Sequence, residues 1–155
     1  MSKRRAAINS LVTLSLAVYL ATAAIISETS VLRSMCGLRG LWQMLACVDD
    51  GAIVGPNIVK DVWFVIDGRK LTVLDASGQV ENEFSMTCKP AGDLIEINLH
   101  RANARRDHTP CLGIANLAGE IMHICLSEEG GQTRPVPFVS EQGSRSQAMQ
   151  FRRIK

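Results

Sequence analysis

From residue 38 onward, apolar residues occur in short runs that are separated by turn residues. Some runs are rich in β-branched and aromatic side chains, as in 62–66, and others alternate apolar with polar residues, as in 94–99. Both patterns predict strands, and no amphipathic helical period of useful length interrupts them. The sequence therefore predicts about eight strands, over residues 40–48, 62–66, 70–74, 79–88, 94–99, 111–117, 121–126 and 149–154.

Turn chemistry between the runs favours antiparallel neighbours. Asp67-Gly68 and Ser77-Gly78 are hairpin signals, because glycine reaches positive φ without strain. We also expect a turn at Lys89–Gly92 and a helical turn over Asn57–Asp61. Residues 135–138 are predicted to be extended but not to form an inner strand, because two prolines remove ladder donors. Regular short strands joined by turns indicate an all-β fold, either a sandwich or a small closed barrel.

The N-terminus has the three parts of a signal peptide in the right order. Lys3-Arg4-Arg5 is a positive n-region, residues 11–20 are an apolar h-region, and Ala21-Thr22-Ala23 fits the small-x-small cleavage rule. We therefore expect an N-terminal signal helix and export to the periplasm or the extracellular space. The alternative is an uncleaved helix, because Ala6–Ile26 is long enough to span a bilayer and would anchor the protein in the membrane.

This reading divides the chain into a signal peptide at 1–23, a short linker at 24–37 and one β-domain at 38–155. Without the signal peptide, the net charge of the protein changes sign. The 155 residues carry 17 basic and 15 acidic side chains, and removing Lys3, Arg4 and Arg5 leaves 14 against 15, a net charge of −1. A near-neutral domain lacks the basic excess of phosphate-binding proteins, so nucleic acid is not an expected partner.

The order and spacing of several short motifs resemble a known family over residues 38–155. The motifs are Leu38-Arg39-Gly40-Leu41-Trp42-Gln43, Asp49-Asp50-Gly51, Leu71-Thr72-Val73, Ile95-Glu96-Ile97-Asn98-Leu99, Leu112-Gly113-Ile114, Leu117-Ala118-Gly119, Ile124-Cys125, Gly130-Gly131, Arg134-Pro135 and Phe151-Arg152-Arg153. Together they resemble the small uncharacterised lipocalin-like domain that planctomycete bacteria carry in many copies. The resemblance implies a small antiparallel lipocalin-like barrel, and it implies no enzymatic activity.

Gly40-Leu41-Trp42 is similar to the Gly-x-Trp near the first strand of lipocalin-like barrels. A Trp at a barrel end closes it with a large apolar plate, and an Arg from the last strand can stack on that plate. Arg152 and Arg153 are both placed to do so. We therefore expect a structural plug made of Trp42 and one of these two arginines.

The mature chain after residue 23 has five cysteines, Cys36, Cys47, Cys88, Cys111 and Cys125, and an exported protein meets oxidising conditions, which favour disulfides, although the odd number leaves at least one cysteine free. If Ala118-Gly119 turns a hairpin with a glycine bulge, Cys111 lies opposite Cys125, close to disulfide range. Leu112, Ile114, Met122 and Ile124 then form the core face. A two-residue turn would instead put the two cysteines on opposite faces, so the register decides between these outcomes.

Residue spacing predicts neither a metal site nor a cofactor site nor an enzyme. His100, His108 and Cys111 lack the close pairing of zinc ligands, as in Cys-x-x-Cys. No Gly-x-Ser-x-Gly occurs, and the adjacent carboxylates at 49–50 and 128–129 fit solvated turns.

The expected function is a non-catalytic binding module, because the inner face of a small barrel can hold one small apolar ligand. The alternative is a structural or protein-interaction domain of the cell envelope whose barrel is filled by its own side chains. The domain is smaller than a typical lipocalin, which favours a filled interior or a narrow pocket. The pattern does not identify ligand-binding residues, and the binding partner is an unknown small molecule or an envelope protein.

Overall fold

The part of the chain that the structure describes is built almost entirely from antiparallel strands. The computed structural model describes residues 37–103, 109–136 and 138–155. Their strands are, in chain order, β1 (Gly40–Asp49), β2 (Ala52–Ile53), β3 (Trp63–Asp67), β4 (Lys70–Leu74), β5 (Val80–Ala91), β6 (Leu94–Arg101), β7 (Cys111–Ala118), β8 (Ile121–Ser127) and β9 (Ser146–Ile154). A short helix, α2 (Pro56–Val59), lies between β2 and β3. The expected signal segment at 1–23 and residues 24–36 of the expected linker lie outside the described residues.

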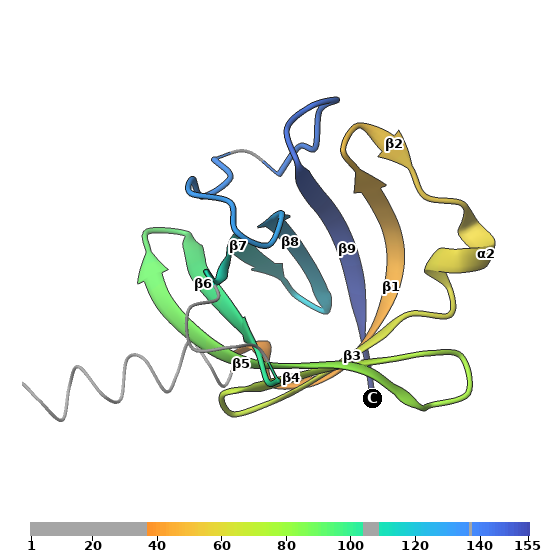
Figure 1. The fold of residues 1–155 in the computed structure, drawn as a ribbon. Coiled ribbons are helices and arrows are strands. Elements are labelled where there is room, and N and C mark those ends of the chain that lie inside the picture. Colours follow the sequence, from red (N-terminus) through yellow and green to blue (C-terminus); the bar gives the residue numbers. More distant parts are fainter. Residues whose placement is uncertain (1–36, 104–108, 137) are drawn as a thin grey trace, which may run out of the picture. The chain divides into compact units, whose positions relative to one another are not determined.

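The strands close into a barrel. From β3 to β9 each strand pairs antiparallel with the next along the chain, and β1 pairs with both β3 and β9. In Figure 1 the first long strand, β1 in orange, lies beside the last, β9 in dark blue. The two-residue β2 pairs only with β1 and lies outside the ring of eight. The prediction of an all-β, antiparallel barrel of eight strands is therefore confirmed.

The local pattern placed most strands well, with one clear exception in β5. Lys70–Leu74 was predicted as a strand and is β4. Lys89–Gly92 was predicted as a turn, yet β5 runs on to Ala91 and the turn follows at Gly92, whose φ is +64°. The reason is that β4 pairs with β5 only up to Ser85, which lies opposite Lys70 at the start of β4. Pro90 therefore stands where one edge of β5 has no neighbour and a missing N–H is tolerated.

The hairpin between β7 and β8 also differs from the expectation. Ala118 pairs with Ile121, so the turn has two residues, Gly119 and Glu120, and it contains no bulge. Gly119 has a φ of +62°, as the first central position of a type II′ turn requires. This register changes which residues of β7 face inward, because a shift of one residue exchanges the two faces of a strand.

Side chains that point into the barrel form one continuous apolar core. In β8, Met122 and Ile124 belong to it, as predicted. In β7 the core residues are Cys111, Ala115 and Leu117, so the assignment of Leu112 and Ile114 to the core face was wrong. The loop after β8 lies on the opposite, outer face of β6 and β7, where Arg134 donates hydrogen bonds to Ile97 O at 2.7 Å and Asn98 Oδ1 at 2.7 Å.

Candidate ligand-binding cavity

The two ends of the barrel differ, and the end that contains the start of β1 is closed. Five side chains with no exposed surface meet there: Leu38, Trp42, Met86, Met122 and Phe151. The Trp42 indole donates a hydrogen bond from Nε1 to Leu38 O at 2.8 Å, which satisfies its one polar atom inside the core. This end is therefore filled with side chains.

Arg153 lies over the closed end. It is directly opposite Trp42 in the β1–β9 register, and its Cζ lies 4.5 Å from the centre of the Trp42 ring. Its Nη2 also donates a hydrogen bond to Gly37 O, and its Nε lies 3.8 Å from a carboxylate oxygen of Glu120. Arg152, the other candidate for this position, is exposed and lies opposite Gln43.

Above the closed end, the barrel encloses a cavity of about 970 Å³ that opens to solvent at the other end. Phe64 and Phe151 separate the two halves, because their ring centres are only 4.3 Å apart and Phe64 borders the cavity. The walls above it are apolar and come from nearly every strand. They include Met44, Val54, Val59, Val62, Leu71, Val73, Phe84, Leu99, Leu126 and Met149. The expectation of a filled interior or a narrow pocket therefore holds only for the closed half.

One side of the cavity is not made by a sheet. β1 pairs with β3 only from Gly40 to Gln43, because β3 begins at Trp63, so β1 extends beyond β3 toward the open end. The chain from 52 to 62, which includes α2, closes this side with Val54, Ile58, Val59 and Val62. Two backbone hydrogen bonds hold its ends, Val54 N to Cys47 O at 2.9 Å and Met44 N to Val62 O at 3.1 Å. Ile58 is 64% exposed and forms part of an apolar lip at the opening.

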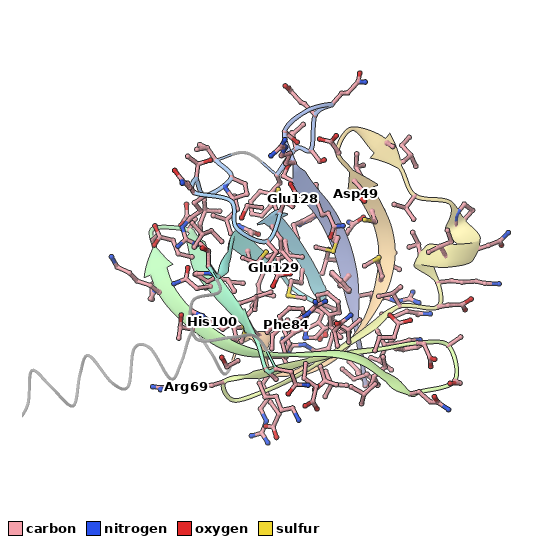
Figure 2. All side chains as sticks on the ribbon, in the orientation of Figure 1. Asp49, Arg69, Phe84, His100, Glu128 and Glu129 are labelled. Atoms are coloured by element: carbon pink, nitrogen blue, oxygen red, sulfur yellow. The ribbon has the colours of Figure 1, made fainter. Side chains whose placement is uncertain are left out.

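Polar side chains gather at the mouth of the cavity, where the strand ends meet the loops. Figure 2 labels Asp49 at the end of β1, and Glu128 and Glu129 directly after β8. Arg101 lies 3.9 Å from Glu129 and donates to Asn82 Oδ1 at 2.9 Å. Because the walls are apolar and the rim is polar, a bound amphipathic molecule would place its polar end at the mouth.

A second ion pair lies at the same rim. Arg145 Nε is 3.8 Å from Glu128 Oε2, and both side chains are largely exposed, so the pair contributes little stability. The backbone N–H of Arg145 also donates to Asp50 Oδ1 at 2.9 Å, which connects the loop before β9 to the turn after β1. These contacts fix the shape of the rim on the β1–β9 side.

Among the described residues, two thiols line the cavity, those of Cys47 and Cys111, and both have raised pKa values. Burial raises the pKa of Cys47, and the nearby Asp49 carboxylate raises it further. Burial raises the pKa of Cys111 to about 11, although its thiol donates a hydrogen bond to Ser127 O at 2.7 Å. Thiols that act as nucleophiles have lowered pKa values, so neither of these two is activated.

The register expected to join Cys111 and Cys125 is wrong. The partner of Cys125 across the β7–β8 pair is Ile114, and both residues are nearly fully buried on the face opposite to Cys111. The physical reason is the two-residue turn at Gly119-Glu120, which places the two cysteines on opposite faces of the wall. Both cysteines are free thiols.

Sequence reasoning did not identify the residues that line the cavity. Phe84, labelled in Figure 2, borders it from β5, and Leu99 borders it from β6. Their even spacing within strands was visible, but it shows only that one face is buried. Which inner faces leave a space between them depends on the register of all eight strands.

Over the described ranges, no group of three or more His, Cys, Asp and Glu side chains is arranged to hold a metal ion. His108, one of the three residues weighed as metal ligands, lies outside those ranges. The described residues also contain no helix with the length and hydropathy needed to cross a membrane. No family model, curated protein or solved structure matches this chain.

Proposed function

We propose that this protein is an exported, non-catalytic binding module whose barrel holds one small, largely apolar molecule. The observation that carries the proposal is the cavity of about 970 Å³ with apolar walls and a polar rim. Ligand sites in proteins are concave, mostly apolar and about 300–1,000 Å³ in volume. The cavity favours ligand binding over a barrel that is filled throughout and serves only as a structural or interaction domain.

The geometry of the ends supports the same function. The closed end is packed around Trp42 and Phe151, so a molecule enters the cavity through the mouth at the other end. An apolar molecule inside would remove its own surface and the exposed wall from water, which is favourable by about 25 cal/mol per Å². We infer that the ligand is largely apolar with one polar end.

The state of the side chains around the cavity supports binding without catalysis. The two lining thiols, Cys47 and Cys111, have raised pKa values and are therefore weak nucleophiles. Among the described residues that line the cavity none is a histidine, the side chain most often used as a general base near neutral pH. Export is supported by the n-region, the h-region and Ala21-Thr22-Ala23.

Native mass spectrometry of protein purified from its own host tests the proposal. A bound small molecule is expected as a mass increment that disappears on denaturation. In parallel, the recombinant protein is titrated with an apolar fluorescent dye that brightens on transfer out of water. Saturable binding of one dye molecule per chain is expected, and failure of the dye and the host preparation alike would contradict the proposal.

A pair of neighbouring substitutions makes this test specific to the cavity. Val73 lines the cavity from β4, whereas the adjacent Thr72 points to the other face of the same strand. Val73→Trp should fill the space and weaken dye binding by about tenfold or more, which corresponds to at least about 1.4 kcal/mol. Thr72→Trp is the matched control and should leave the affinity unchanged. Equal effects of both substitutions would place the dye elsewhere.

A further inference from the structure

Three sulfur-containing side chains lie together on one wall of the cavity. Cys47 on β1 is directly opposite Met149 on β9, so their Cβ atoms are about 4.5–5.5 Å apart. The β1–β9 register shifts between Met44 and Ala46, and this bulge makes Met44 and Cys47 successive inward-facing residues of β1. Met149 is thereby a diagonal neighbour of Met44, at a distance that long side chains span.

All three of these residues line the cavity and keep a small exposed fraction. Met44 is 7% exposed, Cys47 is 8% and Met149 is 6%, and all three border the cavity. By contrast, Met86 and Met122 are 0% exposed and do not border it. All three side chains therefore line the space that a small solute enters through the mouth, whereas Met86 and Met122 pack the core.

We propose that Met44, Cys47 and Met149 bind a soft monovalent metal ion, Cu(I) or Ag(I). Thiolate and thioether sulfurs are soft ligands that select Cu(I) over Mg²⁺, Ca²⁺ and Mn²⁺, which prefer oxygen. One thiol and two thioethers suit a low-charge soft ion better than Zn²⁺, whose structural sites use four thiolate or imidazole ligands. Methionine has three rotatable bonds, so both thioethers can turn toward an ion held by Cys47.

The binding step is a ligand exchange with no change of oxidation state. The Cys47 thiol releases its proton to solvent and forms a bond from sulfur to the metal, as a metal deprotonates a coordinating thiol. The two thioethers donate lone pairs without losing a proton. The Asp49 carboxylate lies close to Cys47 at the polar rim, but carboxylate oxygens are hard ligands, so a soft ion prefers the three sulfurs.

The proposal goes beyond the binding of an apolar molecule and does not depend on it. Met44, Cys47 and Met149 lie on β1 and β9, whereas the Val73→Trp substitution changes a residue of β4. Failure of both the dye titration and the host preparation would contradict the proposed function but would not contradict the metal site. Failure of metal binding would do the reverse.

The test is a titration of the fully reduced protein with Cu(I) in an anaerobic solution that contains a chromophoric Cu(I) chelator as competitor. We expect the protein to withdraw Cu(I) from the chelator. Cys47→Ser should abolish this competition. Met149→Leu and Met44→Leu, which conserve volume, should each weaken it by about tenfold or more, because even second-layer partners of a metal are worth 10–100-fold.

Matched controls separate the site from general thiol binding. Cys88→Ser and Met86→Leu alter residues of the same types that do not border the cavity, and they should leave the affinity unchanged. X-ray absorption of the loaded protein should show sulfur-only coordination. The proposal is overturned if the protein takes no Cu(I) from the chelator, if Cys47→Ser retains full affinity, or if Cys111→Ser removes the binding while Cys47→Ser does not.

Discussion

Arg153 lies above the indole of Trp42, with its guanidinium carbon 4.5 Å from the centre of the ring. The two residues are directly opposite on the first and last strands of the barrel, so their contact spans the seam where the ring closes. Arg153 also donates to Gly37 O, and Trp42 donates to Leu38 O. Trp42 and Arg153 therefore connect the first and last strands at the seam, and both bond to the segment that precedes β1.

Trp42→Ala should destabilise the protein by about 3–5 kcal/mol, because it removes the largest fully buried side chain of the closed end. Urea denaturation followed by circular dichroism measures the change. Arg153→Ala should cost less, about 0.5–2 kcal/mol for the lost cation–π contact. The neighbouring exposed Arg152→Ala is the control and should change stability by less than about 0.5 kcal/mol. An unchanged unfolding midpoint for Trp42→Ala would contradict this account.

Gly113→Ala should destabilise the barrel by about 1–3 kcal/mol through overpacking. A Cβ at this position would collide with the Leu126 side chain and would lie 2.8 Å from the backbone oxygen of Cys125. The side chain could move, but the backbone oxygen belongs to the strand pairing. Gly55→Ala is the matched control, because its Cβ meets nothing within 4 Å and its φ of −61° suits alanine. That variant should be neutral or slightly stabilised, and similar losses for both would refute the explanation.

Stability should fall as the pH rises from about 9 to about 11. Burial raises the pKa of Cys111 from 9.0 to about 11, so in this interval the unfolded chain loses the thiol proton that the folded chain keeps. The contribution is complete below the unfolded pKa and is lost as the pH passes the folded value. Cys47, Cys88 and Cys125 shift in the same direction. Urea denaturation across this range should show a shallower decline for Cys111→Ala, and parallel curves would contradict the prediction.

Export should leave a mature protein that begins near Ala24, as sequencing of the N-terminus of protein from the periplasm or the medium would show. The expectation rests on the small residues Ala21 and Ala23 before the cleavage point. Replacing Ala23 by Phe should block cleavage and leave residues 1–23 attached. Full-length protein in the cytoplasm would overturn the prediction, and full-length protein in the membrane would support the anchor alternative.

Local sequence signals were sufficient to predict where the strands lie in the chain, but not how the strands pair or which face of each points inward. Strand-forming runs and Gly turns act over a few residues, and β4 coincides with its predicted range for that reason. The prediction of a turn at Lys89–Gly92 was wrong because a strand can contain Pro90 only where one of its edges is unpaired. Whether that edge is unpaired depends on how far β4 extends, which residues 89–92 do not determine. The prediction of the inward face of β7 was wrong because the hairpin has a two-residue turn in place of the expected bulged turn. This change moves every side chain of β7 to the opposite face.

The cavity lay beyond the reach of sequence reasoning for a related reason. Leu126 and Phe84 are more than 40 positions apart and border the same space only after the ring has closed. The pairing of Cys47 with Met149 likewise depends on the long-range contact between β1 and β9. By contrast, Trp42 could be proposed as a plug from the sequence, because the short motif Gly40-Leu41-Trp42 and the size of the indole are both local features.

The closed end holds more than the plug. Gly37, where the described chain begins, and Ile154, where β9 ends, both lie there, on the side opposite to the mouth. The C label in Figure 1 marks that end of the chain. A purification tag after Lys155, or a surface to which such a tag is coupled, would therefore hold the protein by its base. Immobilised in this way, the barrel keeps its opening free, which suits it to capture experiments on crude extracts.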